Sequence, residues 1–309
     1  MTILLNLALV PILLLLMWLD PVAITGVNGW VKPLKFSLSI AVYTATFLWL
    51  LTLVQGRRRW VKLAANITAA GLMIEIVLIT MQVARGTSSH FNVSTPFDAA
   101  VFSIMGAMIS LVAVMNLLLA IWLLFQRMPD PVIAWGLRLG VLLSLTGIAV
   151  GVYMTSAPTP AQLAALQTGA ALTNVGAHSV GVPDGGPGLP FLGWSTVGGD
   201  LRIGHFVGLH AMQLLPLVAF VLSRPGARRR FTQTQRLALV WTTGASYLGL
   251  TLLVTWQALR GQPLIAPDTT TLLAAAAWLG ATLFAIALIT LAPMPRTRSI
   301  QPNVVTMDN

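Results

Sequence analysis

The chain has 309 residues, of which 56% are hydrophobic and only 8% are charged, and its mean hydropathy is +0.83. Because about a quarter of the residues in soluble domains are charged, this composition excludes an ordinary soluble protein. The absence of cysteine excludes disulfides, thiolate nucleophiles and cysteine-ligated metals. Apolar runs of about 20 residues recur throughout, which predicts an all-α polytopic integral membrane protein.

Eight apolar runs are long enough to be transmembrane helices. The first lies at the N-terminus and has neither a basic segment nor a small-residue cleavage site before Asp20, so it is interpreted as a retained span and not a signal peptide. The predicted spans are residues 2–19, 34–54, 63–83, 99–125, 135–155, 203–223, 237–259 and 270–292.

The net charge of +10 comes from basic residues in the short connections between these runs, a pattern typical of membrane orientation and not of nucleic-acid binding. Thirteen of the 18 lysines and arginines fall on one side of the predicted layout. The positive-inside rule therefore predicts that both termini are cytoplasmic, and the expected location is the bacterial cytoplasmic (inner) membrane. All four histidines and most of the acidic residues then fall on or near the outer face.

The connection at 156–202, on the outer side, is much longer than the others. Thr159 as an N-cap, Pro160 in the first turn and Gly169 near the end predict a short helix in its first part. The glycines and prolines that follow favour specific turns. Long loops in compact proteins are usually functional, so we expect an ordered loop, with a mobile linker as the alternative.

Paired features in the same order suggest an internal repeat of two four-span halves, residues 1–134 and 135–295, followed by a cytoplasmic tail at 296–309. An even number of spans per half predicts parallel repeats, and hence two four-helix bundles side by side. The matched features are 57–60 with 228–231, 82–86 with 257–261, Lys35-Phe36 with His205-Phe206, Gly29-Trp30 with Gly193-Trp194, and Asp98 with Asp268.

Glu75 is the one acidic residue well inside a predicted span. An ionisable group there is costly and usually faces the bundle interior or a water-filled cavity. Its functional interpretation is a proton carrier, a ligand or a substrate contact, and the alternative is a structural carboxyl that holds helices together. Helix rise places Glu75 and His210 at similar depths, roughly 12 Å and 10 Å from the outer ends of their spans, so they could meet between the halves.

The four histidines have no histidine counterpart in the opposite half, so they are candidates for cofactor binding: His90, His178, His205 and His210. His205 and His210 are five positions apart and diverge by about 140° on a helix, so one helix cannot easily direct both to one metal. Imidazole and carboxylate together suit a divalent ion, with His178, His205 and His210 as candidate ligands. The alternative for a histidine within a span is an interhelical hydrogen bond.

Asp184, Asp200 and Arg202 flank the glycine-rich turns and join Glu75 and His210 as candidate catalytic residues. Their alternative roles are structural. Asp184 precedes two glycines in a favourable turn, and Asp200 could cap the sixth span with Arg202 at the membrane interface.

The stretches KPLKFSLS, ARGTSSHFN and GVPDGGPGLPFLGW resemble those of uncharacterised bacterial multi-pass membrane proteins, which implies no particular activity. The plan of four plus four spans is similar to that of haem A synthases, which have an extracytoplasmic catalytic face. This similarity is architectural, because the predicted spans of the first half contain no histidine.

Three hypotheses follow. The first is a redox membrane protein that binds haem b or a divalent metal. The second is a proton-coupled transporter of small molecules that uses Glu75, and the third is a non-catalytic sensor or assembly partner. The expected partners are the lipid bilayer and a quinone or another small molecule, without nucleic acid, and the oligomeric state is left open.

Overall fold

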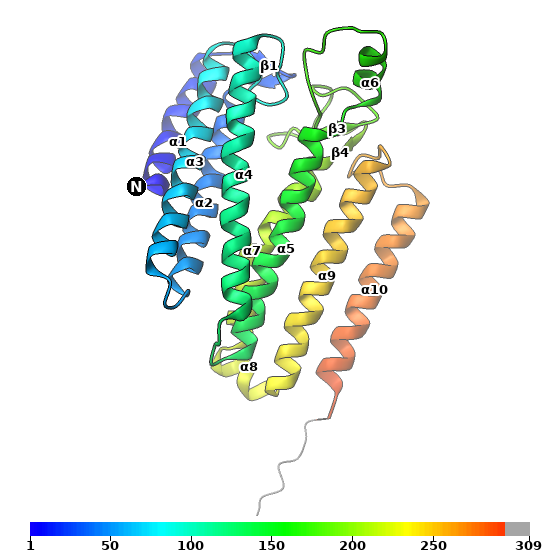
Figure 1. Ribbon diagram of the computed structural model, residues 1–309. Coiled ribbons are helices and arrows are strands. Elements are labelled where there is room, and N and C mark those ends of the chain that lie inside the picture. Colours follow the sequence, from blue (N-terminus) through cyan, green and yellow to red (C-terminus); the bar gives the residue numbers. More distant parts are fainter. Residues whose placement is uncertain (294–309) are drawn as a thin grey trace, which may run out of the picture.

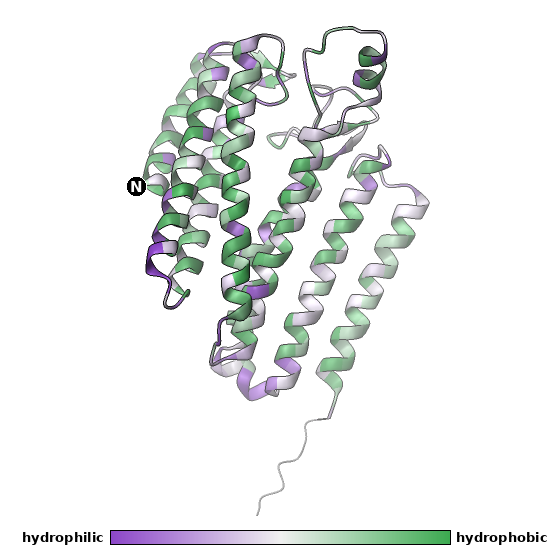
Figure 2. Cartoon of the chain, in the orientation of Figure 1, coloured by the Kyte–Doolittle hydropathy of each residue, from purple (hydrophilic) through white to green (hydrophobic). Residues whose placement is uncertain are grey.

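The computed structural model describes residues 1–293, and the predicted tail at 296–309 lies outside them. Within the described part, eight helices are long and apolar enough to cross a membrane, as predicted. They are α1 (Thr2–Leu19), α2 (Val31–Thr52), α3 (Arg58–Ala84), α4 (Pro96–Phe125), α5 (Pro131–Ser156), α7 (Leu201–Leu222), α9 (Gln233–Leu259) and α10 (Thr269–Leu291). Apolar residues line these helices along their length, and hydrophilic residues gather at the ends and loops (Figure 2).

The remaining elements are short and lie in the connections. The helix predicted after Thr159 is confirmed, and its capping box joins Thr159 to Gln162. The short elements are α6 (Pro160–Gln167), α8 (Pro225–Arg230), and the antiparallel pairs β1 (Ala23–Ile24) with β2 (Val27–Asn28) and β3 (Ser179–Val180) with β4 (Gly199–Asp200).

Helices α1–α4 form one group, and α5, α7, α9 and α10 form the other (Figure 1). The two groups separate between α4 and α5. The division into two repeats and the membrane orientation remain predictions. We use "outer end" for the end of the bundle that carries the 156–202 loop. In α10 only Thr271 is buried, so most of the surface of that helix is available to lipid.

The two halves are joined in the inner half of the bundle. An apolar cluster there draws on α2, α3, α4, α5 and α7. Its most fully buried members are Phe47, Leu50, Leu119, Leu123, Val141 and Met212. Polar contacts also join the two halves here. Asn116 Nδ2 donates to Ser144 Oγ at 2.9 Å, and Arg138 Nη2 of α5 donates to the carbonyl of Gln126 at 2.8 Å.

Helices α5 and α7 are in close contact because small residues line their interface. A Cβ atom on Gly147 would lie 2.6 Å from the carbonyl oxygen of His205 and 2.8 Å from the carbonyl carbon of Gly208. One turn later, a Cβ atom on Gly151 would lie 2.9 Å from the His205 ring. Glycine at both positions therefore allows the backbones to approach and leaves room for an imidazole between them.

We predict that Gly147→Ala destabilises the protein, because the added methyl group meets the α7 backbone. Overpacking of this kind costs about 1–3 kcal/mol, and it lowers the thermal unfolding midpoint of the detergent-purified protein. Gly106→Ala on α4 is the matched control, since a Cβ atom there meets nothing within 4 Å. Equal midpoints for the two variants would contradict the close packing of α5 and α7.

Candidate functional site

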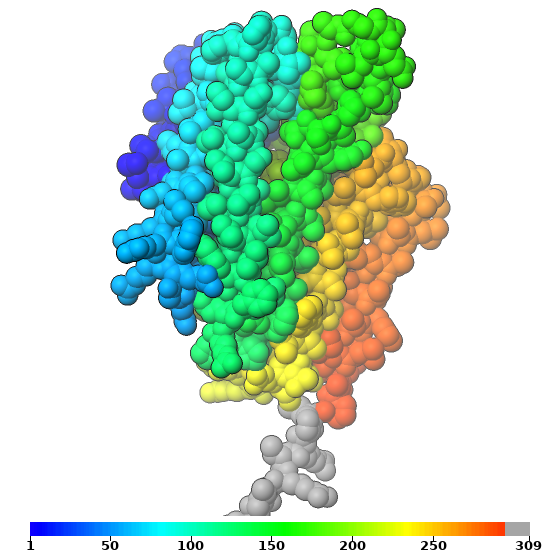
Figure 3. All heavy atoms as spheres, in the orientation of Figure 1, coloured from blue at the N-terminus to red at the C-terminus, as the bar shows by residue number. Residues whose placement is uncertain are grey.

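A cavity of about 2500 Å³ lies between the two halves in the outer part of the bundle. Its walls come from α2, α3, α4, α5 and α7, and the long outer loop covers part of it. The space-filling view shows a hollow between α4 and α5 toward the outer end (Figure 3). The sequence-predicted residues that line the cavity are Glu75, His90, His178, Asp184, Arg202, His205 and His210.

The loop between α3 and α4 carries His90 into this space. Asn92 holds the loop in shape, with Nδ2 donating to Thr87 Oγ1 at 2.9 Å and to the carbonyl of Ser88 at 3.2 Å. Phe91 adopts a φ of 65°, a conformation that costs an L residue of order 1 kcal/mol or more. Its ring compensates by packing edge-on against His178, with centroids 4.7 Å apart. Phe91 thus links the loop that carries His90 to the loop that carries His178.

Glu75 and His90 form a buried pair at the cavity wall. Glu75 is 2% exposed, and its Oε1 lies 3.5 Å from His90 Nε2. Its Oε2 is buried and has no hydrogen-bond partner among residues 1–293. On its other side, the His90 ring lies 3.1 Å from the Ser89 hydroxyl. Burial, together with the nearby charge of Lys32, lowers the pKa of His90 well below its ordinary value, so the imidazole is neutral at neutral pH.

Asp184 organises the glycine-rich loop around His178. Its carboxylate accepts hydrogen bonds from the backbone N–H of Ser179 at 2.7 Å and from both the backbone N–H and Nδ1 of His178 at 3.0 Å. Although burial raises the pKa of Asp184, these hydrogen bonds from His178 and Ser179 outweigh it and hold that pKa below the ordinary range. Burial lowers the pKa of His178. Asp184 thus lies in the predicted turn. Its carboxylate also holds the His178 ring in place.

Asp200 is fully buried and does not line the cavity, but it contacts Arg202, which does. One oxygen accepts from Arg202 N at 3.0 Å and so caps α7, and the other accepts from Ser195 N at 2.8 Å. Arg202 returns a salt bridge through Nη2 at 2.6 Å. The capping role is thus present, and Asp200 acts on the cavity by positioning Arg202.

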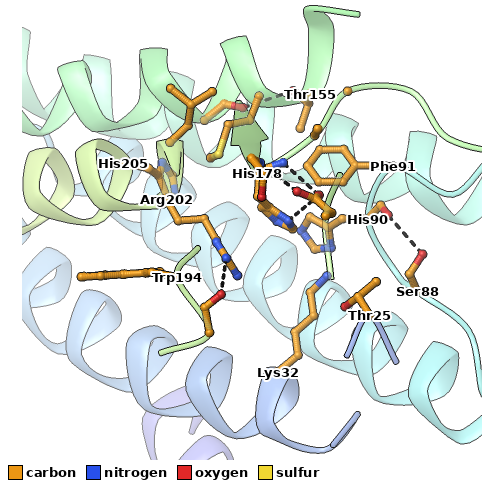
Figure 4. Close-up of a pocket in the computed structure, with 18 of the residues that line it drawn as sticks. Thr25, Lys32, Ser88, His90, Phe91, Thr155, His178, Trp194, Arg202 and His205 are labelled. Atoms are coloured by element: carbon orange, nitrogen blue, oxygen red, sulfur yellow. Dashed lines mark hydrogen bonds and ion pairs between the residues drawn. The ribbon is translucent and has the colours of Figure 1, made fainter. Parts of the chain in front are cut away.

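His205 projects from α7 and has a defined tautomer. Its Nδ1 lies 2.7 Å from the carbonyl oxygen of Gly147. Because a carbonyl can only accept, the proton resides on Nδ1 and the Nε2 lone pair remains available. Figure 4 shows His90 and His178 next to each other, with the Lys32 amine reaching toward them and His205 and Arg202 on the opposite side.

His210 lines the same cavity but is exposed, and the imidazole that Glu75 faces is that of His90. His210 Nδ1 lies 3.3 Å from Gln213 Oε1, and Gln213 Nε2 donates to Thr46 Oγ1 at 3.2 Å. His210 and Gln213 therefore belong to a polar bridge from α7 to α2. The similar depth of Glu75 and His210 places them in one cavity without a direct contact.

The structure gives no support to the metal site predicted at His178, His205 and His210. Among residues 1–293, no group of three or more histidine, aspartate or glutamate side chains is arranged to hold a metal ion. The Nδ1 atoms of these histidines instead face Asp184, the Gly147 carbonyl and Gln213. His205 and His210 thus face different partners, as their angular divergence on one helix predicts.

Sequence reasoning did not single out Lys32, Lys35 or Tyr43, which also line the cavity. The signal was present for the lysines, because both lie at the outer end of an apolar run, against the bias of basic residues to the inner side. Tyr43 carries no such signal. Its hydroxyl is buried and has no hydrogen-bond partner within the described residues.

No protein-family model matches the chain, and neither a curated protein nor a solved structure was found to match it. Functional inference therefore depends on the geometry of the cavity and the chemistry of its lining residues.

The buried histidines predict a pH-dependent stability. Because the pKa of His178 is lower in the folded protein than in the unfolded chain, the unfolded chain takes up the proton first as pH falls below about 6.5. Asp184 stays ionised in this window, since its pKa is also lowered. The thermal midpoint should thus fall between about pH 7.5 and about pH 5.5.

His178→Asn should flatten this slope, whatever it does to the midpoint at neutral pH. A slope that is the same in His178→Asn and in the unsubstituted protein would contradict the burial of a neutral His178.

Proposed function

We propose that this protein is a proton-coupled membrane transporter that binds a small amphiphilic molecule in the outer cavity and uses Glu75 and His90 as its proton-binding pair. The observation that carries the proposal is the environment of Glu75. A carboxyl group that is 2% exposed within a membrane helix has one oxygen facing an imidazole and the other without a partner in residues 1–293. Such groups mark proton and ion pathways in membrane proteins.

The lining of the cavity favours an amphiphilic ligand. Its outer part holds the imidazoles, Arg202 and two lysines, whereas its inner part is formed by apolar side chains of α2, α3 and α4. A polar group could satisfy the first region while an apolar body occupies the second. The apolar residues concerned are Ile40, Leu72, Met105, Ile109 and Val112.

The arrangement of the halves supports transport over simple binding. The cavity lies on the outer side of the apolar cluster, and none of the fully buried members of that cluster lines it. Transporters with a site between two structural halves alternate between states that open to opposite sides. In this proposal the open outer cavity and the closed inner end represent one such state, and transport requires a second state in which the inner contacts open.

A second candidate, haem binding, is favoured by one observation. His178 and His205 each engage an acceptor through Nδ1, which leaves Nε2 available in both. Metal-ligating histidines commonly use their second nitrogen in this way. Protein purified from haem-supplemented cells should then show a Soret band that is lost in His205→Ala, and a colourless protein would exclude this candidate.

We predict that Glu75→Gln abolishes proton-driven uptake. Purified protein in liposomes would be offered labelled amphiphiles of three head-group classes: sulfonate, phosphate ester and neutral hydroxyl. At least one should accumulate faster than in protein-free vesicles under an inward proton gradient. Removing the proton carrier should reduce the gradient-driven rate by a factor of ten or more, equivalent to at least about 1.4 kcal/mol.

The variants separate proton coupling from ligand binding. Glu75→Gln should still bind the accumulated amphiphile, and His90→Gln should resemble Glu75→Gln. Lys62→Gln, at an exposed position of α3 away from the cavity, should transport normally. Uptake no faster than in protein-free vesicles for all three head groups, or unchanged uptake in Glu75→Gln, would overturn the proposal.

A further inference from the structure

Lys32 is a cation at the cavity without a partner in residues 1–293. It is partly buried at the start of α2, and no hydrogen bond or ion pair joins its amine to any described residue. The other charged residues at the cavity have partners. These are Glu75 with His90, Asp184 with His178, Arg202 with Asp200, Arg260 with Asp268, and Lys35 with the Leu192 carbonyl at 2.9 Å.

Glu75 and Asp184 are the acids whose charges act on Lys32, and neither forms an ion pair with its amine. Glu75 Oε1 faces His90, and the oxygens of Asp184 accept three hydrogen bonds from the His178 and Ser179 groups. Lys35 contributes a second positive charge without a carboxylate within 4 Å in the described chain, since its amine contacts a backbone carbonyl. The outer end of the cavity therefore holds two lysine amines, those of Lys32 and Lys35, that form no ion pair with an acid of the described chain.

An apolar face continues inward from Lys32 along the same side of α2. Phe36, Ile40 and Tyr43 follow at spacings of four, four and three residues, which keeps them on one helical face. All three line the cavity, as does Leu72 of α3. Lys32 therefore lies at the outer end of a cavity whose inner walls are apolar.

We infer that the ligand of this cavity is an amphiphilic anion, with its acidic group on the Lys32 amine and its apolar body along Phe36 and Ile40. Its source is either a free single-chain acid or an anionic phospholipid of the surrounding bilayer, since both present a negative group beside an acyl chain. The inference rests on the proposed function, because it takes the cavity as the ligand site.

Binding of three probes that differ only in head group tests this inference. Octanesulfonate, octanol and octyltrimethylammonium would be titrated onto protein in phosphatidylcholine nanodiscs, with empty nanodiscs as blanks. We expect octanesulfonate to bind at least tenfold more tightly than octanol and octyltrimethylammonium to bind least. Replacing a third of the lipid by phosphatidylglycerol distinguishes the sources: weaker octanesulfonate binding then identifies the phospholipid as the occupant, and unchanged binding identifies a free acid.

Three variants assign the preference to Lys32. Lys32→Met keeps an unbranched side chain of nearly the same length and should remove the difference between octanesulfonate and octanol, whereas Lys32→Arg should keep most of that difference. Lys62→Met, an exposed lysine at the inner end of α3, is the matched control and should behave as the unsubstituted protein. An octanol affinity that is the same in all variants would show that each of them keeps the folded cavity.

The outcomes separate this inference from the proposed function. Equal affinities for octanesulfonate and octanol, or a preference that survives Lys32→Met, would overturn the anion inference and leave the cavity as a binding site. Binding of none of the three probes above the empty nanodiscs would overturn both.

Discussion

The contact between Glu75 and His90 is the constraint on which the outer end of the molecule depends. A carboxyl group in a membrane helix needs a polar neighbour, because hydrocarbon offers none. The loop after α3 supplies it, and this requires the left-handed backbone of Phe91 and the hydrogen bonds of Asn92. Phe91 in turn packs on His178, so the position of the long outer loop is linked to a carboxyl group inside α3. The other Glu75 oxygen, Oε2, is buried and has no hydrogen-bond partner within residues 1–293.

The two ends of the interface between the halves have opposite character. At the inner end, apolar side chains and the Arg138 contact to the end of α4 close the interface. At the outer end, glycines draw α5 and α7 together and fix His205, while α2–α4 stand apart from them and leave the cavity. Close packing within one half and separation between the halves thus produce a site that no single helix could form. This is why charged and apolar residues from five helices meet there.

Much of the fold could be predicted because it depends on local sequence. Apolar run length fixes the spans, and the Thr159 and Asp200 caps depend on residues two or three positions away. The assembly of the site could not be predicted in the same way. Counting residues gives the depth of Glu75 but not the direction its side chain faces, so its contact with His90 was not foreseen. In the sequence Lys32 is only one of the basic residues on the outer side, because its lack of a partner depends on how the helices pack.

The central claim is that Glu75 exchanges a proton with its surroundings through the cavity. Infrared difference spectroscopy of the purified protein, stepped from about pH 5 to about pH 9, observes this directly without a ligand. We expect a carboxyl band that titrates in the unsubstituted protein, is absent from Glu75→Gln and titrates differently in His90→Gln. A spectrum without a titrating carboxyl band, or a band that persists unchanged in Glu75→Gln, would contradict it.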